Sequence, residues 1–298
     1  MLTRRQLIGN TAFFGALAGI GLGVPGPVAR SATPLGDMKA AIGGLERARG
    51  GRLGVALLDL ATGVGADWRG EERFALCSTF KLLLAGFILS RVDAGAERLD
   101  RMVMFGKSDL VQWSPLTEPH AGKGMKVEAL CEAIIIQSDN AGANILMRES
   151  GGPEALTDFL RRIGDKVTRV DRIEPGMNVV PAGEERDTTT PLSMLGLMRA
   201  LLIGDVLTPV SRKRLTGWMI DNRTGGTRLR AGLPAGWRIG DKTGSYGPMN
   251  NDIAILWPPA GGPLLLTSYY QNDKASSDDR NAIHAELAAL LARRYKTA

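Results

Sequence analysis

The chain has 298 residues, of which 44% are hydrophobic, and its formal net charge is +6. This length suits one large domain or two closely packed ones, with ample apolar content for a core. The modest charge, without a basic block interleaved with aromatic residues, argues against nucleic-acid binding. The two histidines, His120 and His284, are far apart in the sequence and neither lies near a cysteine pair. We therefore expect neither a metal centre nor a cofactor.

Residues 1–31 predict a signal for export. A twin-arginine pattern at residues 3–8 precedes a glycine-rich, moderately apolar stretch at 11–24, which is too short and too weakly apolar for a convincing membrane span. Small residues around Ala32 offer a cleavage site. We expect a periplasmic protein, exported by the twin-arginine route, with no stable membrane anchor after cleavage. An uncleaved anchor is the alternative.

The next part of the chain predicts a helix, a hairpin and a second helix. Residues 35–49 have the pattern of an amphipathic helix that ends at a glycine pair, and 52–60 and 65–69 predict two strands joined by a tight turn. The apolar run at 82–89 is long enough for a helix that is buried on most sides, and Ser78 lies where that helix would begin.

The middle of the chain predicts helices and one long loop. Helical patterns recur, with interruptions, at 128–137, 140–148, 153–163, 191–202 and 211–222. Residues 172–187 contain two prolines and two glycines and have no apolar periodicity, which is typical of a compact Ω-type loop.

After Gly232 the pattern predicts three strands, at 237–242, 252–257 and 263–270, and a final helix at 278–294. Strands at both ends of the chain indicate an α+β fold, in which an antiparallel sheet is flanked by the N- and C-terminal helices. We expect residues 32–76 and 221–298 to form this α/β lobe. Residues 77–220, with the 172–187 loop, would form an all-helical lobe, and the active site would lie in the cleft between the two.

Ser78 and Lys81 form a Ser-x-x-Lys pattern at the start of the buried helix. Residues three apart share one helical face, so the hydroxyl and the amine can meet. A lysine in this run has no polar face, and burial of an ammonium group is costly unless it is paired or its pKa falls. The simpler interpretation is a helix-capping serine with a lysine that reaches solvent.

Three further polar groups stand in a fixed order along the chain. Each has a simple explanation by itself: helix caps, a lysine at a strand end before a turn glycine, and a solvated acidic residue. The groups are Ser138-Asp139-Asn140, Lys242-Thr243-Gly244 with Ser245 after it, and Glu174 with Asn178 in the Ω-type loop.

Together these motifs resemble those of the class A serine β-lactamases. The resemblance covers nearly all of the mature chain and includes residues 172–175 and 186–191 at the two ends of the loop. It implies an enzyme that hydrolyses the β-lactam amide of penicillins and cephalosporins through a serine acyl-enzyme, and so gives antibiotic resistance. It also implies a protein that acts as a monomer.

The resemblance assigns the catalytic roles. Ser78 would attack the β-lactam carbonyl, and its proton would pass to Lys81 or, through a water molecule, to Glu174. Ser138 would relay a proton to the leaving nitrogen, and the backbone N–H groups of Ser78 and Ser245 would form the oxyanion hole. Glu174 would then activate the water that deacylates the enzyme.

It also assigns the groups that bind substrate. Lys242, the first residue of the Lys-Thr-Gly motif, would attract the substrate carboxylate. Asn140 would bind the acylamido side chain of the substrate. Asn178 would help to hold the deacylating water molecule. Trp113 would form an aromatic wall of the cleft, with ordinary packing as the alternative. Arg228 would bind the substrate carboxylate, with an ordinary surface arginine as the alternative. The complete set of binding residues is Trp113, Asn140, Asn178, Arg228, Lys242, Thr243, Gly244 and Ser245.

The loop carries two further features that the resemblance implies. One is a cis peptide bond before Pro175, and the other is an ion pair between Arg172 and Asp187 that closes the loop. Gly176 and Met177 replace a more usual acidic residue and leucine, so we expect a looser loop, in which little besides the ion pair holds Glu174.

Cys77 and Cys131 are expected to be free thiols. In relatives with a disulfide near the active site, the partner cysteines fall where this chain has Tyr246 and Ala85.

Two other functions share most of these motifs. One is an exported D-alanyl-D-alanine carboxypeptidase or transpeptidase, and the other is a β-lactam receptor that stays acylated. Glu174 in the loop argues against the first, and Glu174 together with Asn178 argues against the second. A degenerate homologue kept for binding has little support, because every motif is intact.

Overall fold

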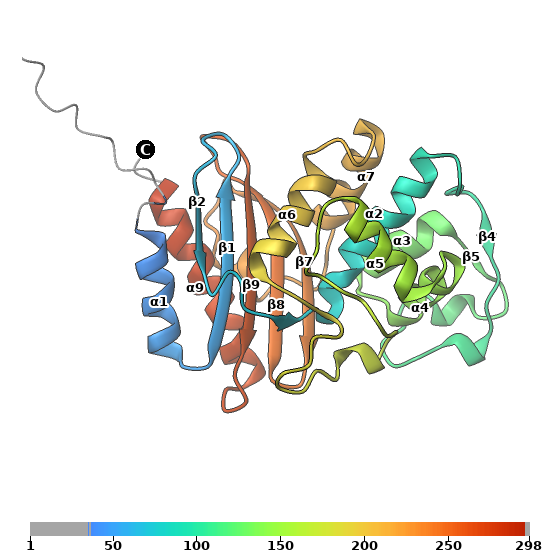
Figure 1. Ribbon diagram of the computed structural model, residues 1–298, viewed down its shortest axis with the longest axis horizontal. Coiled ribbons are helices and arrows are strands. Elements are labelled where there is room, and N and C mark those ends of the chain that lie inside the picture. The colour runs from blue at the N-terminus through green and yellow to red at the C-terminus, as the bar shows by residue number, and fades with distance from the viewer. Residues whose placement is uncertain (1–34, 36, 296–298) are drawn as a thin grey trace, which may run out of the picture. The chain divides into compact units, whose positions relative to one another are not determined.

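The structure is a computed structural model that describes Leu35 and residues 37–295, so the predicted signal at 1–31 lies outside the described residues. In that part of the chain, one antiparallel sheet of five strands has the order β2-β1-β9-β8-β7. Its strands are β1 (Arg52–Asp59), β2 (Gly65–Trp68), β7 (Arg238–Tyr246), β8 (Met249–Trp257) and β9 (Leu264–Gln271). The expected α+β fold, with strands from both ends of the chain in one sheet, is confirmed (Figure 1).

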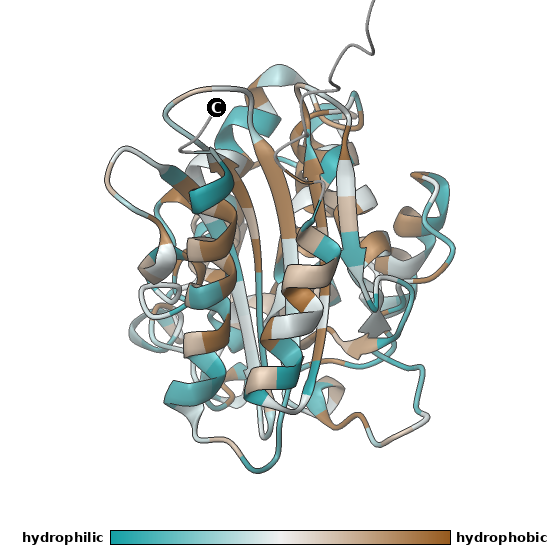
Figure 2. Ribbon diagram, turned by 90° about the vertical axis from the view of Figure 1, so that its left-hand side faces the viewer, coloured by the Kyte–Doolittle hydropathy of each residue, from teal (hydrophilic) through white to brown (hydrophobic). Residues whose placement is uncertain are grey.

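The terminal helices cover one face of the sheet. Helices α1 (Met38–Arg49) and α9 (Ser277–Tyr295) lie side by side there (Figure 1). Ile42 and Leu287 are fully buried in a core that they share with alternate residues of the strands, such as Ala254 and Leu256. Figure 2 shows this side, with hydrophobic strand centres behind helices that carry polar residues outward. Burial of about 25 cal/mol per Å² of apolar surface holds this layer together.

The other face of the sheet packs against α6 and the helical lobe (Figure 1). The central helix of this lobe is α2 (Phe80–Asp93), whose residues 80–89 are all buried, as the apolar run predicted. Around it lie α3 (Val127–Ile136), α4 (Asn140–Glu149), α5 (Gly152–Arg162), α6 (Pro191–Leu202) and α7 (Pro209–Ile220). The short α8 (Leu229–Gly232) packs instead against α9.

Several short elements were not predicted. They include the two-stranded pairs β3 (Phe74–Ala75) with β6 (Thr188–Thr189) and β4 (Met102–Val103) with β5 (Met125–Lys126). They also include the 3₁₀ turns η1 (Cys77–Thr79), η2 (Lys107–Asp109), η3 (Glu118–His120) and η4 (Gly176–Asn178). Segments of two or three residues are too short to produce a hydrophobic period, so sequence patterns cannot reveal them.

Strands β7 and β8 are longer than predicted. The sequence suggested that β7 ends at Lys242 and that a turn follows, but the strand continues through Gly244 to Tyr246 and pairs with β8 along its whole length. Gly244 suggested the turn, because glycine is depleted in strands. The true turn is at 247–248, and β8 begins three residues before the predicted start, at Met249.

None of the helices in the described residues combines the length and apolar character needed to cross a membrane. The same residues contain no group of three or more histidine, cysteine, aspartate or glutamate side chains that could hold a metal ion.

Candidate active site

The predicted hydroxyl–amine pair is formed. Ser78 lies in η1, immediately before α2, and Lys81 Nζ donates a hydrogen bond to its Oγ at 3.0 Å. The Ser78 side chain makes no helix-capping bond, and Lys81 is fully buried, so the capping and solvent-reaching interpretations are both wrong. The turn holds Cys77 at φ +43°, a left-handed conformation that is uncommon for a non-glycine residue.

Lys81 lies among three oxygen atoms supplied by two other segments. Its Nζ is 2.8 Å from the Ser138 carbonyl oxygen, 2.5 Å from Asn140 Oδ1 and 3.4 Å from Glu174 Oε1. Burial lowers the pKa of Lys81, and the negative charge of Glu174 opposes that shift. A buried amine with a lowered pKa can act as a base.

Ser138 and Asn140 reach the site from the junction of α3 and α4. Ser138 adopts φ +57°, and its Oγ lies between two lysines, 3.4 Å from Lys81 Nζ and 3.1 Å from Lys242 Nζ. The middle residue, Asp139, caps α4 by accepting the Gly142 N–H at 2.8 Å. The helix-cap interpretation is therefore correct for Asp139, while the residues on either side of it face the cleft.

Glu174 faces Ser78 from the 172–187 loop. Glu174 Oε1 accepts a hydrogen bond from Ser78 Oγ at 3.4 Å, and Oε2 accepts one from Asn178 Nδ2 at 2.5 Å. The carboxylate is almost fully buried, and the peptide bond to Pro175 is cis, as the resemblance implied.

Sequence reasoning missed Asn144. Its side chain bonds both backbone groups of Glu174: Nδ2 donates to the carbonyl oxygen and Oδ1 accepts the N–H, each at 2.9 Å. Asn144 follows Asn140 by four residues on α4, so the two share a helix face. That spacing was the available signal.

The two ends of the loop are held by a buried carboxylate. Asp187 Oδ2 accepts from Arg172 Nε at 2.5 Å, and Oδ1 accepts the backbone N–H groups of Asp171 and Arg172. Asp187 is fully buried, whereas the Arg172 side chain is 27% exposed. The loop also has an apolar anchor, because Met177 is fully buried in the core. The expectation that little besides the ion pair holds Glu174 is therefore wrong.

Strand β7 brings the Lys-Thr-Gly motif to the opposite wall. Lys242 is fully buried and donates to Ser138 Oγ at 3.1 Å and to the Thr243 carbonyl oxygen at 2.8 Å. Burial and the positive charge of Lys81 lower the pKa of Lys242 well below its usual value.

Gly244 is required by a close approach. A Cβ atom built there would lie 3.0 Å from the Ser78 backbone nitrogen and 3.0 Å from Cys77 Cβ. The strand therefore runs directly beside the backbone N–H of the candidate nucleophile, and the interpretation of Gly244 as a turn glycine is wrong.

Arg228 and Trp113 both line the cleft. Arg228 is only 7% exposed and donates to the Gly244 and Asn251 carbonyl oxygens, at 2.9 and 2.6 Å, and to Ser245 Oγ, so it is not a surface arginine. Trp113 is 59% exposed at φ +66°, and its Nε1 donates to the Gln137 carbonyl oxygen at 2.9 Å. That exposure argues against ordinary core packing.

These side chains enclose a cleft of about 330 Å³, within the range of small-molecule sites. Its lining residues include Ser78, Trp113, Ser138, Asn140, Glu174, Asn178, Arg228, Thr243, Gly244, Ser245 and Tyr246.

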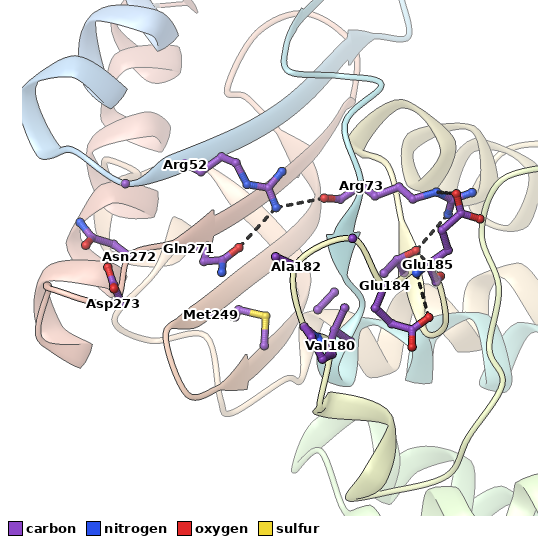
Figure 3. Close-up of a pocket in the computed structure, with 15 residues that line it drawn as sticks. Arg52, Arg73, Val180, Ala182, Glu184, Glu185, Met249, Gln271, Asn272 and Asp273 are labelled. Atoms are coloured by element: carbon purple, nitrogen blue, oxygen red, sulfur yellow. Dashed lines mark hydrogen bonds and ion pairs between the residues drawn. The ribbon is translucent and has the colours of Figure 1, made fainter.

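A larger cavity of about 730 Å³ lies behind the 172–187 loop, away from the motifs (Figure 3). Its arginines are already paired: Arg52 with Gln271 and the Arg73 carbonyl oxygen, and Arg73 with Glu185 (Figure 3). Residues from each of the sequence motifs line the smaller cleft instead.

Both cysteines are buried and free, as predicted. Burial raises the pKa of the Cys77 thiol to about 12. A thiol with such a pKa is a poor nucleophile near neutral pH, although it adjoins Ser78.

A family model described as "Beta-lactamase enzyme family" matches residues 37–295. Beta-lactamase L2 of Stenotrophomonas maltophilia is 44% identical over 300 residues, which cover 97% of this chain and 98% of that protein. Beta-lactamase OXY-2 of Klebsiella oxytoca is 42% identical over 249 residues, covering 83% and 86%.

Solved structures are similarly close. An ancestral class A β-lactamase (GNCA) matches with a TM-score of 0.85 and 53% identity over 86% of this chain and 99% of that chain. A β-lactamase from Xanthomonas campestris pv. campestris matches with a TM-score of 0.86 and 47% identity, covering 89% and 99%.

Proposed function

The chain belongs to the class A serine β-lactamases, which hydrolyse β-lactam antibiotics and confer resistance to them, and we propose that Ser78 is the nucleophile through which it acts. One observation carries this proposal. Ser78 Oγ lies 3.0 Å from Lys81 Nζ and 3.4 Å from Glu174 Oε1 in a cleft of suitable size. A serine hydroxyl needs such a base to become an effective nucleophile.

In acylation, Ser78 Oγ forms a bond to the β-lactam carbonyl carbon while its proton leaves. Lys81 and Glu174 are 3.4 Å apart, so a proton taken by either can be shared with the other. We assign the base to this pair as a unit. The negative charge that develops on the carbonyl oxygen would be stabilised by the backbone N–H groups of Ser78 and Ser245. The close approach of Gly244, the residue before Ser245, to the Ser78 nitrogen supports this assignment.

Cleavage of the C–N bond needs a proton on the departing nitrogen. Ser138 Oγ is the candidate donor, because it touches both Lys81 Nζ and Lys242 Nζ. The proton removed from Ser78 can return to the substrate through this bridge.

The substrate carboxylate would lie at the Lys242 end of the cleft, beside Thr243 and Ser245. Arg228 supports that assignment, because its guanidinium group donates to Ser245 Oγ and its other hydrogen bonds within the described residues go to neutral oxygens. Asn140 would bind the acylamido group, and the exposed face of Trp113 would pack against the substrate.

Deacylation would use Glu174 as the base for a water molecule. Asn178 holds the carboxylate at 2.5 Å, and its own Oδ1 is buried without a hydrogen-bond partner in the described residues. That free acceptor suits a bound water. The arrangement favours turnover over the permanent acylation expected of a receptor.

We also propose that residues 1–31 direct export by the twin-arginine route and that the mature protein is an unanchored periplasmic monomer. The division into an α/β lobe (32–76 and 221–298) and a helical lobe (77–220) is proposed on the same basis.

Mass spectrometry of the protein mixed with a penicillin tests this function. The wild type should form a transient adduct and release hydrolysed product, Ser78→Ala should form no adduct, and Glu174→Ala should accumulate one. An adduct on Ser78→Ala would overturn the assignment of the nucleophile. An adduct that clears from Glu174→Ala as fast as from the wild type would overturn the role of Glu174.

A further inference from the structure

Asp252 is a fully buried carboxyl group behind the end of the cleft that would bind the substrate carboxylate. It lies on β8, paired with Thr243 of β7 on one side and with Ser268 of β9 on the other. Its Oδ2 accepts the Leu229 N–H at 3.1 Å, whereas its Oδ1 has no hydrogen-bond partner among the residues that the structure describes. A buried ionised carboxylate with one neutral donor would be strongly disfavoured.

A second buried carboxylate shares the same face of the sheet. Asp241 is two residues from Thr243 on β7, so it is a diagonal neighbour of Asp252. Asp241 has both an ionic and a neutral partner: Arg230 Nε at 2.5 Å and Asn222 Nδ2 at 2.7 Å. Of two close carboxyl groups, the one without a cation holds a proton more readily. Burial and the negative charge of Asp241 accordingly raise the pKa of Asp252 well above its usual value.

Arg228 is the cation nearest to the cleft on this side. Its Nε donates to Asn281 Oδ1 at 2.8 Å, and its other contacts are the carbonyl oxygens and the hydroxyl already described. Within the described residues, none of its hydrogen bonds goes to a carboxylate. Its charge is therefore buried beside the cleft without a bonded counter-ion.

Helix α9 supplies two further titratable side chains that face this region, His284 and Arg280. His284 Nε2 donates to the Asn250 carbonyl oxygen at 3.1 Å, and in the neutral ring its Nδ1 accepts from Ser268 Oγ at 2.8 Å. Burial lowers the pKa of His284 to about 3, which agrees with that tautomer. Arg280 is engaged with Asn250 Oδ1 and with backbone carbonyl oxygens.

We propose that Asp252 is kept as an uncharged carboxylic acid, so that the charge of Arg228 remains available to the carboxylate of the incoming β-lactam. An ionised Asp252 would give Arg228 a permanent counter-ion and would compete with the substrate. Asp252 is thus a positioning residue that acts through Arg228 and touches no substrate. The inference rests on the role proposed above for Arg228.

The test compares a chromogenic cephalosporin with its carboxylate methyl ester. The ratio of kcat/KM for acid and ester measures what the substrate carboxylate contributes, and a purely structural defect lowers both values together. Asp252→Asn mimics the neutral acid and should leave the ratio within about twofold of the wild type.

Asp241→Asn provides the opposite change, because it removes the like charge that keeps Asp252 protonated. We expect the ratio to fall by about tenfold or more as Asp252 ionises. The double variant, Asp241→Asn with Asp252→Asn, should restore the ratio.

A tenfold loss of the ratio in Asp252→Asn alone would overturn the proposal, as would a double variant no better than Asp241→Asn. Carbon-13 NMR of the Asp252 carboxyl group, assigned by its disappearance in Asp252→Asn, gives an answer independent of activity. A protonated signal at neutral pH is expected, and an ionised signal would contradict the inference. Absence of hydrolysis of both substrates by the wild type would refute the proposed function instead, and the NMR result would still decide the charge of Asp252.

Discussion

Replacement of Asn144 by alanine tests how Glu174 is held against the acyl-enzyme. The Asn144 side chain hydrogen-bonds to the backbone N–H and carbonyl oxygen of Glu174, each at 2.9 Å. Neither hydrogen bond involves the Glu174 carboxylate. The substitution therefore leaves the carboxylate chemically intact and removes only its backbone anchor. Asn178 and the loop-closing ion pair of Arg172 would remain.

The size of the effect follows from two lost hydrogen bonds. Each contributes about 0.5–1.5 kcal/mol net, so Asn144→Ala should destabilise this position by about 1–3 kcal/mol. If that energy is lost from the deacylation transition state, the deacylation rate constant falls by roughly 5-fold to 150-fold. Acylation should change less, because Lys81, the other half of the proposed base pair, still contacts Ser78 directly at 3.0 Å.

Stopped-flow measurement of acylation, with mass spectrometry of the adduct's lifetime, separates the two steps. Arg148→Ala is the matched control, because Arg148 also lies on α4, its side chain is 51% exposed, and it pairs with Asp109 near the surface. An exposed pair of this kind contributes about 0–1 kcal/mol. Equal losses in both steps, or an unchanged adduct lifetime in Asn144→Ala, would refute this reasoning.

Three further predictions concern other parts of the site. Gly244→Ala should lower kcat/KM by roughly 10²-fold, because the new methyl group would lie 3.0 Å from the Ser78 nitrogen and displace an oxyanion donor; unchanged kinetics would contradict this. Asp187→Asn should lower Tm, slow turnover of small penicillins and favour bulkier cephalosporins. The loss in free energy of unfolding should lie below the ~3–5 kcal/mol expected for a fully buried pair, since Arg172 is partly exposed. An Asp187→Asn enzyme with an unchanged ranking of substrates would contradict this prediction. Asp252→Asn should have a higher Tm than the wild type, and this difference should grow as the pH rises above about 4. The raised pKa means that folded Asp252 keeps a proton that the unfolded chain releases, so wild-type stability falls with rising pH; a pH-independent difference would exclude this.

The sequence predicted the parts of the fold that have a long hydrophobic period. The run after Ser78 predicted a buried helix because nearly every position in it is apolar, and α2 has no exposed residue from 80 to 89. It could not predict where β7 ends. Gly244 after the strand-end lysine looks like a turn residue, and only the approach of the Ser78 backbone explains why a glycine stands inside that strand.

The site shows the same division. Ordered motifs predicted Ser78, Lys81 and Glu174, because each stands in a recognisable local context. Asn144 and Asp252 have no such context, since their roles arise from contacts with residues 30 and 23 positions away. The four-residue spacing from Asn140 could place Asn144 on the helix face that carries Asn140. A contact between distant segments leaves no mark on local composition, so only the fold could reveal which residues Asn144 and Asp252 contact.

The charges of the cleft explain why an anionic substrate suits it. Lys81 contacts one carboxylate, Glu174, whereas Lys242 and Arg228 hydrogen-bond only to neutral oxygens in the described part of the chain. In this part of the chain the buried basic side chains of the site therefore outnumber the carboxylates that contact them until a substrate carboxylate arrives. That carboxylate would oppose the burial and the charge of Lys81 that lower the pKa of Lys242. Substrate binding and protonation of Lys242 are therefore linked, and a neutral Asp252 preserves the imbalance on which both depend.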